Sequence, residues 1–227
     1  MKSLRSLLFS FIVILLSILV AAPVSAGTIW TDWTSATNGN PGSAVGTLNG
    51  VAVTYTGEII TYATGGTAAG FWAPDSSFIG GTVTTSPSIV GDLIGLQGSY
   101  TGINKITFNS PIVNPVLAIW SLGSPSNQAS FVNFSQTPTF EAGGPNSQYG
   151  GGPITVLGNT VSGLEGNGVV QFTGMFTTLT WTNTSEFWYA FTVGTAEGST
   201  SVPEPTTMLL FGLGLIGVLG IRRKIKK

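Results

Sequence analysis

The sequence predicts an all-β protein: an antiparallel, jelly-roll-like two-sheet sandwich between an N-terminal signal helix and a single C-terminal transmembrane helix. Between residues 27 and 201, Gly, Ser and Thr are abundant, yet 21 residues are aromatic, which argues against disorder. Turn-forming residues recur every eight to twelve positions, and no apolar pattern keeps a helical period over a helix length. No segment of 20 to 50 residues repeats, so neither a solenoid nor a propeller is expected.

Residues 1–26 have the pattern of a secretory signal peptide. Lys2 and Arg5 precede an apolar run over 7–20, and small residues stand before Gly27. An uncleaved membrane anchor is the alternative, but so short a run barely crosses a hydrocarbon core of about 30 Å. We therefore expect cleavage near Gly27 and a secreted domain over 27–200.

Alternating apolar and polar residues predict the strands of this domain. The expected strands are 51–56, 59–63, 105–109, 116–122, 131–134, 154–157, 160–164, 169–173, 177–182 and 187–193. The dipeptides Gly158-Asn159 and Asn167-Gly168 favour the positive φ of tight hairpin turns. The short polar link 183–186 predicts that the last two strands are antiparallel neighbours. Pro111 and Pro115 restrict their segment to a sheet edge or a bulge.

The C-terminus has three parts in a fixed order. Val202-Pro203-Glu204-Pro205 is followed by an uncharged, Gly-rich stretch and then by a basic end over 222–227. The two prolines keep the chain extended, and a helix over 206–221 measures about 24 Å at about 1.5 Å per residue. The basic end is expected to remain cytoplasmic. A permanent single-pass anchor is the alternative reading, but the four glycines of the span favour an easily unwound segment.

This C-terminal pattern resembles the PEP-CTERM protein-sorting tail, also called the ice-binding protein C-terminal domain. The resemblance covers residues 201–227 and implies export in a Gram-negative, exopolysaccharide-producing bacterium. It further implies transient anchoring in the inner membrane and cleavage by exosortase, a membrane-embedded Cys protease. The residues that carry it are the sorting motif Val202, Pro203, Glu204 and Pro205 and the topology-setting Arg222, Arg223 and Lys224. Segments 106–123, 166–174 and 188–194 resemble the β-rich ectodomain of many such proteins.

Charge and composition exclude several function classes. One lysine, Lys105, stands against eight acidic residues between 27 and 201, which gives a formal charge of −7 and makes nucleic acid an unsuitable partner. Without Cys or His there is no disulfide, thiolate nucleophile, imidazole base or Cys/His metal site. The sequence therefore predicts a non-enzymatic surface or biofilm-matrix protein, without cofactor or metal.

The alternative function is a carbohydrate-binding module or adhesin that acts on exopolysaccharide. Trp30, Trp33 and Trp72 stand near Gly, Ser and Asn, and we expect them to form a glycan-binding face, because indole rings stack on sugars. Trp120 and Trp181 fall within apolar strand patterns and are expected in the core.

Three other activities are weighed against simpler readings. A glycosidase needs two carboxylates that face each other, but the acids form no clustered motif. Calcium would use Asp75, Asp92 or Glu165, none of which shows the spacing of an EF-hand. The Thr-x-Thr pieces lack the constant period of an ice-binding array. Lys105 could activate a Ser, but it lies on the solvent side of its strand pattern.

Overall fold

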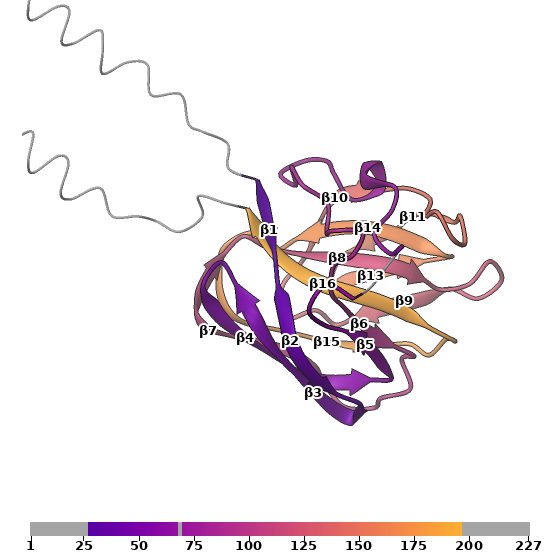
Figure 1. The fold of residues 1–227 in the computed structure, drawn as a ribbon. Helices are drawn as coiled ribbons and strands as arrows, with labels where there is room; N and C mark the ends of the chain where they lie inside the picture. The colour runs from indigo at the N-terminus through magenta and orange to yellow at the C-terminus, as the bar shows by residue number, and fades with distance from the viewer. Residues whose placement is uncertain (1–26, 68–69, 197–227) are drawn as a thin grey trace, which may run out of the picture.

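The computed structural model describes residues 27–67 and 70–196, which form a sandwich of two sheets (Figure 1). The strands are β1 (Thr28–Trp30), β2 (Asp32–Thr37), β3 (Gly39–Leu48), β4 (Val51–Ile59), β5 (Thr61–Ala63), β6 (Leu93–Leu96), β7 (Asn104–Val113), β8 (Pro115–Leu122), β9 (Ala129–Val132), β10 (Thr139–Gly143), β11 (Gly152–Pro153), β12 (Thr155–Leu157), β13 (Thr160–Gly163), β14 (Gly166–Gln171), β15 (Met175–Asn183) and β16 (Tyr189–Ala196). A 3₁₀ turn, η1 (Asp75–Ser77), lies between β5 and β6.

Each sheet contains eight strands. The first has the order β10-β14-β8-β16-β6-β5, with β1 paired to β16 and β11 paired to β14. The second has the order β12-β13-β9-β15-β7-β4-β3-β2. All pairs are antiparallel except β11 with β14, so the predicted antiparallel two-sheet architecture is confirmed.

The core is double because both faces of the first sheet are covered. Along β8, Leu117 and Ile119 belong to the cluster between the sheets, whereas Ala118 and Trp120 belong to a second cluster on the outer face. The chain between β5 and β6 supplies residues such as Phe78 to that second cluster. This extra layer explains why β8 is a continuous apolar run rather than an alternating one, since a strand buried on both faces needs apolar residues at every position.

Aromatic rings fill the space between the sheets. Trp181 contacts Tyr55, Phe131, Phe134 and Phe191, with ring centroids 5.4–5.9 Å apart. Trp120 and Trp181 are each 1% exposed, so their expected core positions are confirmed. Lys105 is exposed on β7, also as expected.

Glu58 is a fully buried carboxylate at the end of β4. Its two oxygens accept hydrogen bonds from the backbone N–H groups of Gln97, Gly98 and Ser99 and from the Ser99 hydroxyl, over 2.5–3.0 Å. These donors belong to the chain that follows β6, so this one side chain joins strands of the two different sheets.

Two predicted hairpins are wrong. The strands over 177–182 and 187–193 are not neighbours, because β15 pairs with β7 and β9 while β16 pairs with β8 and β6 in the other sheet. The polar link between them therefore crosses the sandwich. Asn167-Gly168 is not a turn but part of β14, beside an irregularity in its pairing with β8. There the Asn167 side chain is buried and accepts a hydrogen bond from the Ser121 N–H at 2.8 Å.

Other local predictions are confirmed. Gly158-Asn159 joins β12 to β13 with Leu157 opposite Thr160, and Gly158 has φ +55°. Pro111 lies in β7 within the bulge opposite the Phe176–Thr178 step of β15. Pro115 is the first residue of β8, where a missing N–H is tolerated.

Strands β1, β2, β3, β6, β10 and β11 were not predicted. The inward face of β3 consists of Gly42, Ala44, Gly46 and Leu48, and the first three are too small to produce an apolar pattern. At Gly46 a Cβ atom would collide with the Asp32 carbonyl oxygen, so close backbone approach requires glycine.

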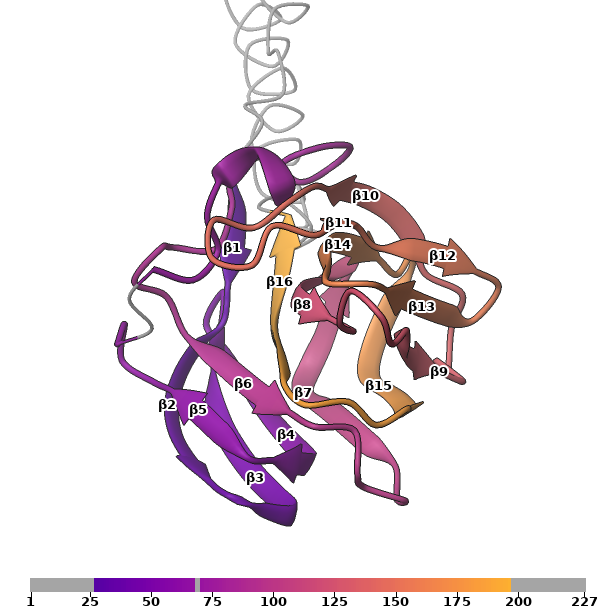
Figure 2. The same cartoon turned by 90° about the vertical axis from the view of Figure 1, so that its right-hand side faces the viewer.

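The first and last strands of the sandwich, β1 and β16, lie side by side. Thr28 of β1 is opposite Ala196 of β16, so the first and last strands of the described chain are neighbours (Figures 1 and 2). Among the described residues there is no helix with the length and apolar character needed to cross a membrane. The expected signal helix over 1–26 and transmembrane helix over 206–221 fall outside the described residues.

Candidate functional site

The three tryptophans expected on a glycan-binding face have different environments. Trp30 is half-buried, but Trp33 and Trp72 are both 0% exposed, so their expected exposure is wrong. Trp33 packs in the core between the sheets, and its Nε1 donates to the Thr192 Oγ1 at 3.3 Å. Trp72 lies in the outer-face cluster with its ring 5.5 Å from that of Phe78. Neither ring can stack on an external sugar.

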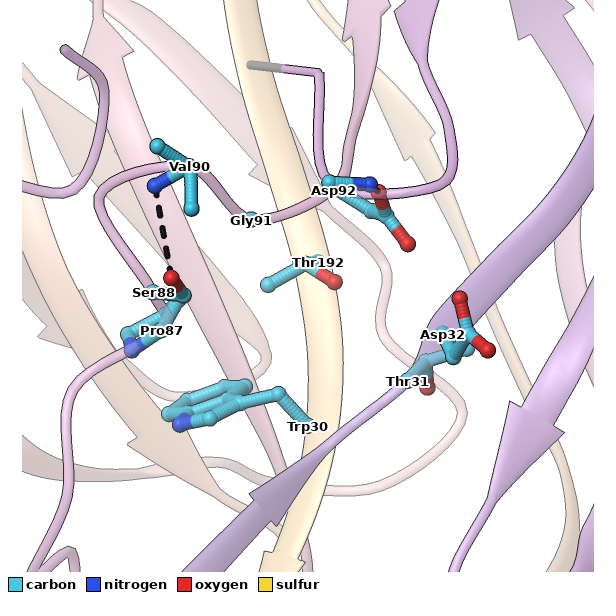
Figure 3. A pocket seen from close by; sticks show the side chains of 10 residues that line it. Trp30, Thr31, Asp32, Pro87, Ser88, Val90, Gly91, Asp92 and Thr192 are labelled. Atoms are coloured by element: carbon cyan, nitrogen blue, oxygen red, sulfur yellow. Dashed lines mark hydrogen bonds between the residues drawn. The ribbon is translucent and has the colours of Figure 1, made fainter. Parts of the chain in front are cut away.

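Trp30 lines a cavity of about 290 Å³ on the outer side of β16, which we call the Trp30 cavity (Figure 3). Its walls come from the end of β1, the start of β2, the middle of β16 and the chain over 87–92. The lining residues include Trp30, Asp32, Pro87, Ser88, Asp92 and Thr192. In Figure 3 the indole and Pro87 form one side, the two carboxylates the other, and Thr192 lies between them.

The position of the indole ring follows from strand pairing. Trp30 is directly opposite Gly194 of β16, where a Cβ atom would lie only 2.7 Å from the ring. The glycine thus lets the ring lie close over the strand. The indole N–H donates to the Thr85 carbonyl at 2.9 Å, which fixes the ring edge and leaves the ring itself as cavity wall.

The two carboxylates reach the cavity from different segments. Asp92 is 7% exposed, and its oxygens accept the backbone N–H groups of Trp33 at 2.8 Å and Gly66 at 2.7 Å. Asp32 is exposed and points toward Asp92. Burial raises the pKa of Asp92 above its usual range, and the charge and hydrogen bonding of Asp32 raise it further, against the lowering effect of the two N–H donors.

This arrangement supports binding chemistry. A half-buried indole beside carboxylate and hydroxyl oxygens offers both an apolar face and hydrogen-bond acceptors, the combination that sugar-binding sites use. Within 27–67 and 70–196, no three His, Cys, Asp or Glu side chains come together to hold a metal ion. Of the acids considered for calcium, Asp75 accepts the Ser86 hydroxyl at 2.7 Å, and Asp92 and Glu165 lie in separate clusters.

A second pair of acids lies near the start of β16, away from the chain ends. Glu165 accepts the Ser121 hydroxyl at 2.5 Å, and Glu186 accepts the Gly123 N–H at 3.1 Å. Burial, with a contribution from the charge of Glu165, raises the pKa of Glu186 to about 7, although two backbone hydrogen bonds lower it. Ser121 and Glu165 both have positive φ, at +57° and +54°. The two acids lie close enough for the charge of Glu165 to affect the pKa of Glu186.

Sequence reasoning missed most of the Trp30 cavity. Asp32 and Thr192 were not singled out, and Asp92 was considered only as a calcium ligand. The sorting-motif residues Val202, Pro203, Glu204 and Pro205 and the topology residues Arg222, Arg223 and Lys224 lie outside the described residues.

Comparison with known families identifies the C-terminal segment. The model of the PEP-CTERM protein-sorting motif matches residues 201–224, so the suspected tail is confirmed. No curated protein and no solved structure matches the chain. The motif indicates that the protein is exported with membrane association and sorted to the cell surface through processing by exosortase, a membrane protease.

Proposed function

We propose that this chain is a non-enzymatic component of the cell surface or extracellular polysaccharide matrix of a Gram-negative bacterium. The observation that carries the proposal is the sorting motif at 201–224, which follows directly on a folded, Cys- and His-free β-sandwich. In this proposal the signal peptide starts export, the span over 206–221 holds the chain briefly in the inner membrane, and cleavage near 202–205 releases it.

The pairing of β1 with β16 fits such a route. Thr28 and Ala196 are paired neighbours, so the first and last described residues of the sandwich lie at the same end of the domain (Figure 1). The domain can complete its fold outside the membrane while still attached, because all strands of both sheets lie before residue 197.

The test is the intact mass and the terminal peptides of the protein recovered from the surface and medium of its own host. We expect a chain that begins at Gly27 and ends between 201 and 205. Glu204→Ala is expected to leave the protein in the membrane fraction with its tail intact, whereas Glu197→Ala, the same change seven residues upstream, is processed normally. Processing of the Glu204 variant at the normal rate contradicts the assigned role of the motif.

A second function, carbohydrate binding, is favoured by the Trp30 cavity. The cavity joins an indole wall to carboxylate and hydroxyl groups on a protein that the motif directs to the cell surface. Glycan arrays and pull-down with matrix polysaccharide test it, with Trp30→Ala as the binding variant and Tyr149→Ala, an exposed aromatic outside the cavity lining, as the matched control. Equal glycan retention by both variants would contradict the assignment to this cavity.

The absence of enzymatic activity is part of the same proposal and has its own test. The Glu165 and Glu186 pair is the place where glycosidase activity would arise. We expect no release of reducing sugar from native matrix polysaccharide. Release that disappears in Glu186→Gln would replace the proposal with a matrix hydrolase.

A further inference from the structure

The Trp30 cavity holds two carboxylates that no basic side chain of the described chain neutralises. Lys105 is the one basic residue within 27–67 and 70–196, and it lies exposed on β7 in the second sheet, whereas the cavity borders β16 of the first. Asp92 is stabilised only by two backbone N–H donors. A cationic group between Asp32 and Asp92 would therefore meet two carboxylates whose mutual repulsion it relieves.

The wall opposite the carboxylates, formed by Trp30 and Pro87, indicates what kind of molecule would carry this cationic group. The Trp30 ring and the buried Pro87 present an apolar surface on which the C–H face of a pyranose ring can stack. The Thr192 side chain lies between this wall and the carboxylates, and Ser88 lies beside Pro87. Thr192 accepts the Trp33 indole N–H, which leaves its own hydroxyl proton available to a ligand oxygen.

We propose that the cavity binds a hexosamine residue of a polysaccharide through its free, protonated amine, with the ammonium between Asp32 and Asp92 and the pyranose ring against Trp30. This inference rests on the carbohydrate-binding function proposed above and names its ligand class. At about 290 Å³ the cavity has the size of the smallest ligand sites, about 300 Å³, which suits one sugar ring.

Two other ligands fit the walls less well. Calcium takes about six to eight oxygen ligands, but only two carboxylates line the cavity, and Trp30 and Pro87 offer no side-chain oxygen. A neutral or N-acetylated sugar satisfies the indole wall but leaves the carboxylate pair without a counter-charge. Burial is the main cause that raises the pKa of Asp92, and the nearby charge of Asp32 raises it further.

The experiment measures binding of three matched β-1,4-linked hexamers to the full chain in neutral detergent by calorimetry at pH 6. The probes are the hexamers of glucosamine, N-acetylglucosamine and glucose, with hexalysine as a polycation without sugar rings. We expect the glucosamine hexamer to bind at least tenfold more tightly than the other two sugars, with an affinity that falls as salt is raised. Asp32→Asn removes this preference, and Trp30→Ala weakens the binding of every sugar.

Control variants separate the cavity from general charge attraction. Glu141→Gln removes one negative charge at a partly exposed site outside the cavity and is expected to keep the preference. Equal affinity for the three sugars that depends on Trp30 overturns the amine assignment and leaves carbohydrate binding in place. Binding of hexalysine as tight as that of the glucosamine hexamer and insensitive to Trp30→Ala overturns it too, in favour of a bare cation site. Failure of every sugar to bind overturns both the hexosamine assignment and the carbohydrate-binding function on which it rests.

Discussion

Replacement of Glu58 by Gln is expected to destabilise the sandwich by about 3 kcal/mol, although the two side chains have nearly the same shape. Glu58 is 0% exposed, and Lys105, the one basic residue of the described chain, is itself exposed, so the two Glu58 oxygens depend on four hydrogen-bond donors. Because these donors follow β6 while Glu58 ends β4, their loss weakens the junction between the two sheets.

The magnitude follows from the geometry of the two oxygens. One accepts the Ser99 N–H at 3.0 Å and its hydroxyl at 2.6 Å, and the other accepts the N–H groups of Gln97 at 3.0 Å and Gly98 at 2.5 Å. Glutamine keeps one oxygen but places an NH₂ group against two donors. Two hydrogen bonds to a charged acceptor, at about 1.5 kcal/mol each, are then lost. With a urea m-value of about 2 kcal/mol/M, the unfolding midpoint falls by about 1.5 M.

Tryptophan fluorescence during urea unfolding is the measurement. All six tryptophans lie between residues 30 and 188, so the signal of the full chain in detergent reports on the sandwich. Glu141→Gln is the control, since Glu141 accepts two hydrogen bonds from Thr82 at a solvent-accessible site, and a change of about 0.5 kcal/mol or less is expected there. Equal shifts in the two variants would refute the reasoning from burial.

Three further changes test other parts of the fold. Glu186→Gln is expected to flatten the pH dependence of stability. In the wild type the raised pKa of Glu186 stabilises the fold below pH 4.5, and about 1 kcal/mol of this stabilisation, after solvent screening, is lost as the pH rises to about 7. Urea unfolding midpoints measured across that pH range test this. Gly98→Ala is expected to prevent folding at 37 °C, seen as loss of near-UV circular dichroism, because φ is +73° and the new Cβ would collide with the Thr184 carbonyl oxygen. Leu117→Ala is expected to cost about 2–5 kcal/mol in thermal unfolding, whereas Leu157→Ala, 85% exposed in wild type, leaves the melting temperature nearly unchanged.

The architecture was predictable because its signals are local. Period-2 patterns and turn residues identify strands such as β4 and β15 from short windows, and β8 is identified by its continuous apolar run. The Gly158-Asn159 hairpin also depends only on the conformations of two residues. The sorting tail is similar, since its motif is identified from one contiguous stretch of sequence, residues 201–224.

The assignment of strands to sheets was not predictable in the same way. An alternating strand has the same pattern in either sheet of a sandwich, so the sequence over 177–193 cannot distinguish a hairpin from a crossing. The structure resolves the choice through distant partners: the Glu186 N–H donates to the Gln97 carbonyl at 2.8 Å, which holds the crossing against the end of β6. Asn167 illustrates the same point, because a residue typical of turns is buried in β14 as a hydrogen-bonding centre.

The Trp30 cavity shows why a binding site can escape a sequence that reveals the fold. Trp30, Trp33 and Trp72 have similar neighbours in sequence, yet of the three only Trp30 is partly exposed, because Trp33 packs in the core between the sheets and Trp72 packs in the outer-face cluster. Thr192 lies near Trp30 because β1 pairs with β16, and Asp92 is held there by the backbone N–H groups of Trp33 and Gly66. The site therefore depends on the pairing of the first strand with the last strand. Under the proposal of carbohydrate binding, a change that opens the β1–β16 pairing is expected to abolish sugar binding before it unfolds the core.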